Sequence, residues 1–172
     1  LEEVVRNNLI VDEGDPFNEI LFNKSVNNIK SLGIFKKVTA DVEDGSNESF
    51  KEINIDVEER PTGEISVTAG FGTTGETIGA GIKENNFLGK GIKLNTNLEL
   101  TPESIKGQFI YAKPNFNYSD NTLFTSLKSS TSDFLTDSGY KTSNIGFSLG
   151  TKFEQFQNIF LSPEIDFLIE DL

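Results

Sequence analysis

The chain has 172 residues, of which 15 are Lys or Arg and 27 are Asp or Glu, so its formal net charge is -12. This acidic balance opposes nucleic-acid binding, because that binding needs cations to displace the counterions of phosphates. Because the sequence contains no His and no Cys, the usual acid–base and thiol chemistry, Cys-based zinc sites and disulfides are excluded.

Any membrane crossing would have to use strands, because the apolar runs fall far short of the roughly 20 residues of a spanning helix. Barrel strands alternate in character, so a modestly hydrophilic sequence is compatible with a barrel. The chain starts at Leu1, has no Met, and ends at Leu172 inside an expected strand. We therefore expect a piece of a longer protein, with room for one medium domain or two small ones.

Residues 1–62 are predicted to begin with two helices, separated by a break at Gly14 and Pro16. Asn18 is expected to cap the start of the second helix, and Gly33 to end it. Helical spacing of apolar residues supports both elements. The positions are Leu1, Val4, Val5, Asn8 and Leu9 in the first helix, and Leu21, Phe22, Val26, Ile29 and Leu32 in the second.

Two strands of alternating character complete this α+β part, joined by a turn at residues 44–47. Because two strands give two helices little sheet to cover, we expect a further strand upstream of Leu1. The inward residues are Val38, Ala40 and Val42 in the first strand, and Ile53, Ile55 and Val57 in the second.

After Gly63 the sequence is almost entirely β, with seven segments that alternate apolar with polar or glycine residues. A soluble antiparallel sheet with one wet face shows the same alternation. Several segments, however, reach the roughly 9–11 residues of a tilted spanning strand, and the apolar face carries almost no charge, which favours a barrel. The segments are residues 64–71, 77–83, 91–100, 104–116, 123–131, 144–153 and 158–170.

Four motifs that could suggest a binding or catalytic site have simpler structural explanations. Gly70–Gly75 spells the dinucleotide fingerprint, but a glycine-rich strand follows where a helix should open, so a tight hairpin is expected. Leu88–Gly91 is predicted to be a turn and not a phosphate loop, and Asp41–Glu48 a hairpin tip and not a calcium loop. Glu164, Asp166 and Glu170 are separated by multiples of two residues, as expected for carboxylates on the water-facing side of a strand. No catalytic residue, cofactor-binding residue or metal ligand is predicted.

Several stretches, in this order, resemble the BamA-type outer-membrane assembly proteins. Residues 4–38 resemble the two helices of a POTRA domain, with its Glu-Gly-Asp-Pro-Phe turn and Leu-Gly-x-Phe step. Residues 53–75 resemble the passage from the last POTRA strand through Pro-Thr-Gly into the first barrel strand. Residues 82–94, with Asn86–Gly89 at the turn, resemble the second hairpin, and Tyr111–Phe116 a later strand ending in Pro-x-Phe.

This resemblance implies a POTRA domain over residues 1–62 without its first strand, then about seven antiparallel transmembrane strands of an incomplete barrel over residues 63–172. It implies a bacterial outer-membrane protein with its POTRA part in the periplasm. The expected partners are unfolded outer-membrane β-barrel clients, accessory periplasmic lipoproteins and lipid, with no cofactor and no enzymatic activity. A related POTRA-barrel transporter for one or a few secreted clients, of the TamA or two-partner kind, and a soluble α+β binding module remain open alternatives.

Three groups of site residues follow from the resemblance. The first barrel strand would form a seam with the last one and pair with a client by β-augmentation. Gly70 and Gly72 would make that seam weak, or would only ease barrel curvature or a turn. The residues of this strand are Glu64, Ile65, Ser66, Val67, Thr68, Ala69, Gly70, Phe71 and Gly72. A second edge for augmentation is expected on the POTRA strand of Lys36, Lys37, Val38, Thr39, Ala40, Asp41 and Val42. The hinge between the two parts is expected at Pro61, Thr62 and Gly63.

Overall fold

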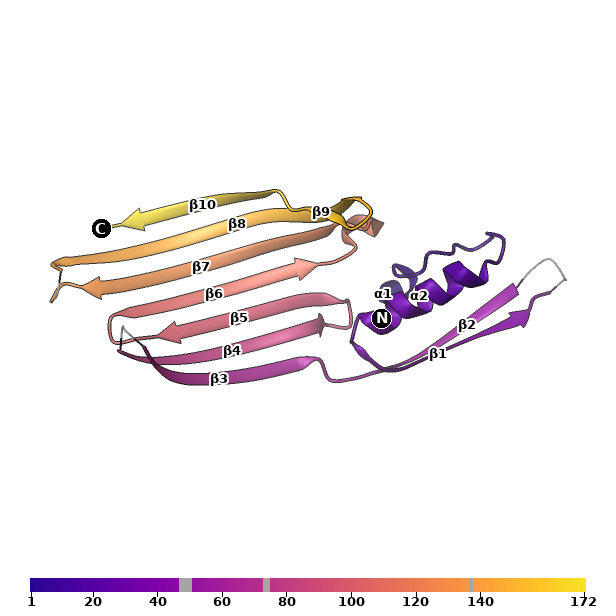
Figure 1. The fold of residues 1–172 in the computed structure, drawn as a ribbon, viewed down its shortest axis with the longest axis horizontal. Helices are drawn as coiled ribbons and strands as arrows, with labels where there is room; N and C mark the ends of the chain where they lie inside the picture. The colour runs from indigo at the N-terminus through magenta and orange to yellow at the C-terminus, as the bar shows by residue number, and fades with distance from the viewer. Residues whose placement is uncertain (47–50, 73–74, 137) are drawn as a thin grey trace. The chain divides into compact units, whose positions relative to one another are not determined.

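A computed structural model describes residues 1–46, 51–72, 75–136 and 138–172 of the chain. The chain divides into two compact units, Leu1–Thr62 and Gly63–Leu172 (Figure 1). No helix among the described residues is both long and apolar enough to cross a membrane.

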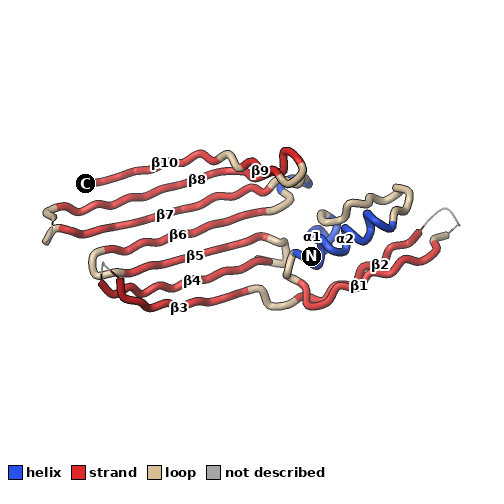
Figure 2. The backbone as a smooth tube through the Cα atoms, in the orientation of Figure 1, coloured by secondary structure: helices blue, strands red, loops and turns tan. Residues whose placement is uncertain are grey.

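The first unit has two helices and a two-stranded antiparallel sheet (Figure 2). Helix α1 spans Glu2–Arg6 and helix α2 spans Glu19–Ser31. Strand β1, Phe35–Asp44, pairs with strand β2, Lys51–Glu59. The register sets Val38 opposite Val57, Ala40 opposite Ile55 and Val42 opposite Ile53, so the six alternating apolar residues share one face, as predicted.

Both ends of α2 follow the prediction. The Asn18 side-chain oxygen accepts the N–H groups of Ile20 at 2.9 Å and Leu21 at 3.1 Å, which satisfies two of the unpaired donors of the first turn. The helix ends at Ser31, and Gly33 then takes a φ of +68°, the left-handed conformation that glycine adopts at low cost after a helix.

A small core joins the helices of this unit to its sheet. Val4, Ile29, Ile34 and Phe35 are buried together, with Ile29 fully shielded from solvent. The apolar face of α2 is narrower than predicted, because Leu21 is 37% exposed while Phe22 and Val26 are buried.

The second unit is one antiparallel sheet in which successive strands lie side by side, in the order β3-β4-β5-β6-β7-β8-β10 (Figure 1). A 3-10 turn, Phe116–Tyr118, lies between β6 and β7. The strands are β3, Gly63–Gly72; β4, Gly75–Phe87; β5, Ile92–Leu100; β6, Ser104–Lys113; β7, Thr122–Phe134; β8, Tyr140–Phe156; β9, Ile159–Leu161; and β10, Glu164–Asp171.

Strands β4, β7 and β8 are longer than predicted, and two further strand boundaries differ from the prediction at proline. The single strand expected over residues 158–170 is two strands, β9 and β10, separated at Pro163, which has no N–H for the ladder. Its carbonyl instead accepts the N–H of Thr151 at 3.1 Å. Strand β6 ends at Lys113, before Pro114, and not at Phe116.

The glycine-rich motifs are turns. Gly72 pairs with Gly75 across the β3–β4 hairpin, and β4 follows directly, so no helix N-terminus is present to hold a pyrophosphate; Thr73 and Thr74 lie outside the described residues. The turn after β4 uses left-handed φ angles at Leu88 (+58°) and Gly89 (+68°), and Asn86 Oδ1 accepts the Gly91 N–H at 2.8 Å.

Candidate functional site: an open strand edge on a two-faced sheet

The pairing register separates the side chains of the second unit into two faces. Residues directly opposite each other in an antiparallel pair share a face, so the register can be followed across all seven strands. One such row, on what we call the outer face, is Ile65, Ile82, Thr96, Phe109, Leu127, Phe147 and Phe167. The next row is Val67, Ala80, Leu98, Gly107, Ser129, Ile145 and Ile169.

The outer face exposes large apolar side chains that a water-facing surface would not gather in rows. Ile65 is 79% exposed, Phe167 61% and Leu127 51%. A cation facing mid-bilayer lipid costs about 2–4 kcal/mol, and among the described residues the charges of this face lie only near strand ends. They are Glu76, Glu84, Lys113, Asp133, Lys141 and Asp171. The outer face therefore suits contact with lipid.

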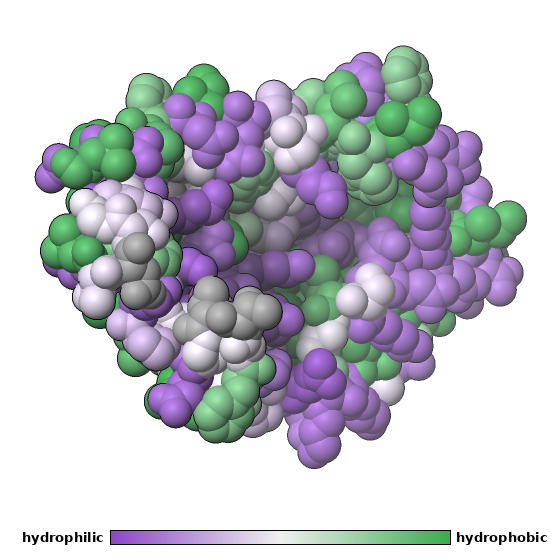
Figure 3. Space-filling model, turned by 60° about the vertical axis from the view of Figure 1, so that its left-hand side comes forward, coloured by the Kyte–Doolittle hydropathy of each residue, from purple (hydrophilic) through white to green (hydrophobic). Residues whose placement is uncertain are grey.

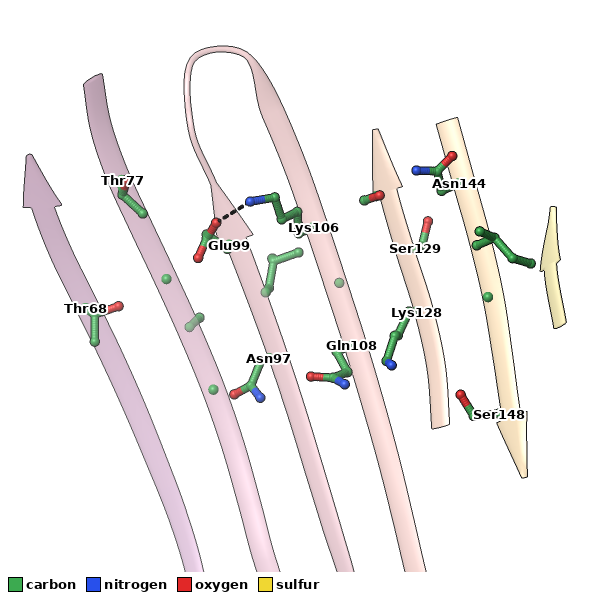
Figure 4. A pocket seen from close by; sticks show the side chains of 18 of the residues that line it. Thr68, Thr77, Asn97, Glu99, Lys106, Gln108, Lys128, Ser129, Asn144 and Ser148 are labelled. Atoms are coloured by element: carbon green, nitrogen blue, oxygen red, sulfur yellow. Dashed lines mark hydrogen bonds and ion pairs between the residues drawn. The ribbon is translucent and has the colours of Figure 1, made fainter. Parts of the chain in front are cut away.

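The opposite, inner face is polar and concave, with a cavity of about 880 Å³ along it. Figure 3 shows hydrophilic side chains gathered in the hollow, and Figure 4 shows them reaching into it from neighbouring strands. One row of this face is Ser66, Gly81, Asn97, Gln108, Lys128, Gly146 and Leu168, and the next is Thr68, Gly79, Glu99, Lys106, Ser130, Asn144 and Glu170.

Polar side chains of the inner face bond to each other across strands. Lys106 Nζ lies 3.1 Å from Glu99 Oε1 (Figure 4). Ser126 Oγ donates to Ser148 Oγ at 3.2 Å, and Ser148 Oγ donates to Asp166 Oδ1 at 2.5 Å. Asp166 therefore links β10 to β8 in the wall, which agrees with the wet-face interpretation of the carboxylate row.

The strand predicted as the seam, residues 64–72, lies in β3 at one edge of this sheet. Among the described residues only β4 pairs with it. Every residue of β3 is exposed, and residues 1–62 form a separate unit with its own sheet. Half of the backbone N–H and C=O groups of β3 thus point away from β4, toward an unpaired side.

Glycines of β3 and β4 have different surroundings. A Cβ at Gly70 or Gly72 would meet nothing within 4 Å, and neither residue has a left-handed φ. A Cβ at Gly79 would lie 2.5 Å from Thr68 Oγ1, and one at Gly81 2.6 Å from Ser66 Oγ. Side chains of β3 thus require Gly79 and Gly81 of β4, whereas no neighbouring atom requires Gly70 or Gly72 of β3.

The predicted POTRA edge, residues 36–42, lies in β1. The β1–β2 register shifts between Phe35 and Lys37, a bulge that places Lys36 outside the regular pairing, and Lys36 Nζ lies 2.7 Å from Glu58 Oε1. Bulges and lysines hinder edge pairing, so Val38–Val42 is the part of the predicted edge that is free of both. Each strand of a two-stranded sheet has a second side, and the geometry does not distinguish β1 from β2.

The predicted hinge residues lie where the two units join. The Arg60 N–H donates to the Ile34 carbonyl at 3.1 Å, and Gly63 begins β3. Pro61 and Thr62 belong to no helix or strand.

The acidic stretch at residues 41–48 has a structural role where it is described. Asp41–Asp44 belong to β1, while Asn47 and Glu48 lie outside the described residues. Asp44 is ion-paired with Lys51, and this hydrogen bond and charge lower the pKa of the Asp44 carboxyl. Within the described part of the chain, no three His, Cys, Asp or Glu residues are grouped to hold a metal ion.

Sequence reasoning missed the β8–β9 hairpin and the serine–aspartate chain between β7, β8 and β10. The Ser162-Pro163 step was the available signal for the hairpin, because proline interrupts a ladder. No signal in the sequence predicted the chain of hydrogen bonds, because this chain depends on the register between strands.

Comparisons with known proteins agree with this architecture. Residues 1–60 match the POTRA family model, described as a surface antigen variable number repeat. The “Putative outer membrane protein assembly factor” of Treponema pallidum is 29% identical over 109 residues, 60% of this chain and 13% of that protein. The outer membrane protein assembly factor BamA of Neisseria meningitidis is 26% identical over 117 residues, 67% of this chain and 15% of that protein.

Solved structures show the same fold. BamA from Haemophilus ducreyi lacking POTRA domains 1–3 matches 99% of this chain and 33% of its own, with a TM-score of 0.85 at 21% identity. CdiB from Acinetobacter baumannii matches 94% of this chain and 35% of its own, with a TM-score of 0.56 at 13% identity.

A POTRA unit followed by antiparallel strands with an apolar outer face and a polar inner face defines a POTRA-barrel protein of the bacterial outer membrane, with its POTRA part in the periplasm. Within that class, residues 1–60 match the POTRA family, and the chain is similar to the BamA-type outer-membrane assembly proteins. The predicted fold class and location are thereby confirmed. The chain spans about a seventh of the length of these curated relatives.

Proposed function

We propose that this chain is part of a factor that folds and inserts β-barrel proteins into the outer membrane, and that β3 accepts the client strand. The observation that carries this proposal is the open edge of β3: ten exposed residues, paired on one side only among the described residues. The edge joins an apolar outer face to a polar inner face, so an added strand would continue both.

Membrane energetics explain why such an edge is useful. In lipid each unpaired backbone N–H or C=O costs several kcal/mol, so a strand needs a partner before it enters. Strand addition supplies main-chain hydrogen bonds that do not depend on client sequence. The client strand must still alternate apolar with polar residues, because a client residue opposite Val67 would face lipid and one opposite Thr68 would face the hollow.

Glycine makes β3 suited to a seam that opens. Gly70 and Gly72 weaken the strand, since glycine contributes no side chain to pack and loses more backbone entropy. No neighbouring atom or φ angle requires either glycine, which is compatible with weak pairing of β3. A seam that opens at low cost would release the β3 edge for a client.

The two units would divide this work. We assign residues 1–62 to a POTRA domain and residues 63–172 to the N-terminal portion of a transmembrane barrel, with Pro61, Thr62 and Gly63 as the hinge. The Val38–Val42 edge of β1 is a second place for strand addition, by a client or by an accessory periplasmic lipoprotein. The outer face of the sheet contacts lipid.

Depletion of the full-length protein tests this function. We expect a broad fall in all outer-membrane barrel proteins, measured by quantitative proteomics of the outer membrane. Loss of only one or a few secreted clients would instead indicate a dedicated POTRA-barrel transporter.

Cysteine crosslinking tests the role of β3, because the chain contains no Cys. In the full-length protein, Thr68→Cys should form disulfides with cysteines placed along a client strand that is stalled during insertion. The matched control is Lys106→Cys, on the same inner face but in β6, between two paired strands. Equal crosslinking at both positions would contradict strand addition at β3.

A further inference from the structure

Strand β8 extends beyond the sheet and forms a hairpin of its own. It has 17 residues, and its pairing with β7 ends at Lys152 opposite Thr122. Phe153–Phe156 pair only with β9, through Phe153 opposite Leu161, Glu154 opposite Phe160 and Phe156 opposite Ile159. We call residues 153–161 the β8–β9 hairpin; because strands alternate in direction, it lies at the end of the sheet where β3 begins.

A bulge in this hairpin gathers apolar side chains on one face. Ile159 and Leu161 are two residues apart on β9, so they share a face, and their opposite residues Phe156 and Phe153 share it with them. The register shift between Glu154 and Phe156 provides the extra residue that turns Phe156 to this side. Phe153 alternates in step with Phe147 on β8, so the hairpin continues the outer face.

Three of these side chains are exposed, and Phe153 is half-buried. Phe156 is 66% exposed, Ile159 55% and Leu161 46%. A contiguous apolar patch of this kind marks a contact surface. The patch continues a face whose rows already suit lipid, and residues 120–122, at the start of β7, line a cavity beside it together with Phe153 and Phe156.

Lysines accompany aromatic rings at this end of the sheet. Lys152 Nζ lies 5.0 Å from the centre of the Phe160 ring, and Lys113 Nζ lies 6.0 Å from that of Phe116. Both rings are exposed. Aromatic rings prefer the membrane–water interface, and lysines there extend their ammonium groups toward phosphates. Lys113 belongs to the outer face, so its charge complements a phospholipid headgroup, whereas Lys152 and Phe160 lie on the inner side of the hairpin.

We propose that the β8–β9 hairpin is an interfacial anchor that inserts Phe153, Phe156, Ile159 and Leu161 into the headgroup–acyl boundary of the periplasmic leaflet. This inference rests on the outer-membrane location of the sheet and not on client insertion. The anchor holds the part of the wall far from β3, so that β3 can open while β8 keeps its depth in the bilayer.

Depth-dependent quenching tests the anchor in the full-length protein, reconstituted in vesicles of phosphatidylethanolamine and phosphatidylglycerol. Phe156→Cys and Ile159→Cys carry an environment-sensitive fluorophore, in a background where any other cysteine is replaced. Leu127→Cys in the outer face is the reference for mid-bilayer depth. Asp120→Cys, in the exposed turn before β7 at the same end of the sheet, is the reference for water.

We expect both hairpin labels to shift to shorter emission wavelength and to lose most of their fluorescence to a headgroup nitroxide lipid. The Leu127 label should instead respond to a nitroxide near the acyl terminus, and the Asp120 label to aqueous iodide. Hairpin labels that behave like Asp120, with Leu127 still quenched by lipid, would overturn the anchor. Labels shielded from both iodide and lipid would overturn it in favour of a protein partner. An unquenched Leu127 label would overturn the membrane placement and the anchor with it.

Discussion

Thr68 on β3 lies directly over Gly79 on β4, so close that a Cβ at Gly79 would be 2.5 Å from Thr68 Oγ1. The same arrangement recurs two residues along, where Ser66 lies over Gly81. The close packing in the hairpin that carries the open edge thus depends on small residues of β4, whereas Gly70 and Gly72 of β3 have open space around them.

The first prediction concerns this contact. Gly79→Ala should destabilise the sheet by about 1–3 kcal/mol, because the added methyl forces a shift of Thr68. Thr68→Ala in the same protein should restore most of the loss. Gly70→Ala, with open space around it, is the matched control and should be tolerated. Thermal unfolding of the detergent-purified full-length protein, followed by gel mobility, measures all three; equal losses for Gly79→Ala and Gly70→Ala would contradict the contact.

The two faces of the sheet predict opposite responses to charge. Leu127→Arg places a cation in the outer row and should cost about 2–4 kcal/mol if that row faces mid-bilayer lipid. Gln108→Arg places the same side chain in the polar hollow and should be tolerated. The measurement is the yield of protein inserted into vesicles. Equal yields for the two variants would show that the outer face does not contact lipid.

Two neighbouring prolines test the β3 edge. Along an antiparallel strand, consecutive residues direct their N–H groups to opposite sides. Of the two substitutions Val67→Pro and Thr68→Pro, one therefore removes an N–H donor to β4 and the other removes an N–H donor to the open side. We expect both variants to lower outer-membrane protein levels. The one that affects only the open side should leave the β3–β4 hairpin folded. Normal client levels in both variants would argue against the seam.

The cap of α2 predicts a stability effect confined to the first unit. Asn18→Ala removes the acceptor for the N–H groups of Ile20 and Leu21 and should cost about 1 kcal/mol. Asn18→Asp keeps an acceptor and should cost little. Urea unfolding followed by a label in α2 makes the measurement. An unchanged midpoint for Asn18→Ala would show that water replaces the cap without cost.

The Asp44–Lys51 ion pair predicts a small pH dependence of the β1–β2 hairpin. Because the pair lowers the pKa of Asp44 in the folded state, its stabilisation is present above the ordinary pKa of the carboxyl. It is lost as pH falls through the lowered value. Lys51→Met should return the Asp44 pKa to its ordinary range, as measured by carbon-13 NMR titration of the carboxyl. An unchanged titration midpoint would mean that the ion pair does not form in solution.

Local residue chemistry was enough to predict most helices and strands of this protein, although not β9 as a separate strand. Asn18 and Gly33 bound α2 because capping depends only on neighbouring backbone groups, and alternation over residues 64–72 predicted β3 because side chains on a strand have a period of two. Proline explains two of the boundaries that were wrong. At Pro114 and Pro163 the missing N–H ends a strand, although the apolar alternation continues past both residues in the sequence.

The sequence by itself determined that the chain is α+β and then antiparallel β, and that its strands have one apolar and one polar side. Only the tertiary structure decided which residues form rows across seven strands. It also decided that Asp166 bonds to Ser148, that Gly79 lies under Thr68, and that Phe156 turns to the face of Phe153. The physical reason is that register and bulges arise from pairing between distant segments, whereas caps, turns and alternation are properties of residues close together in the chain.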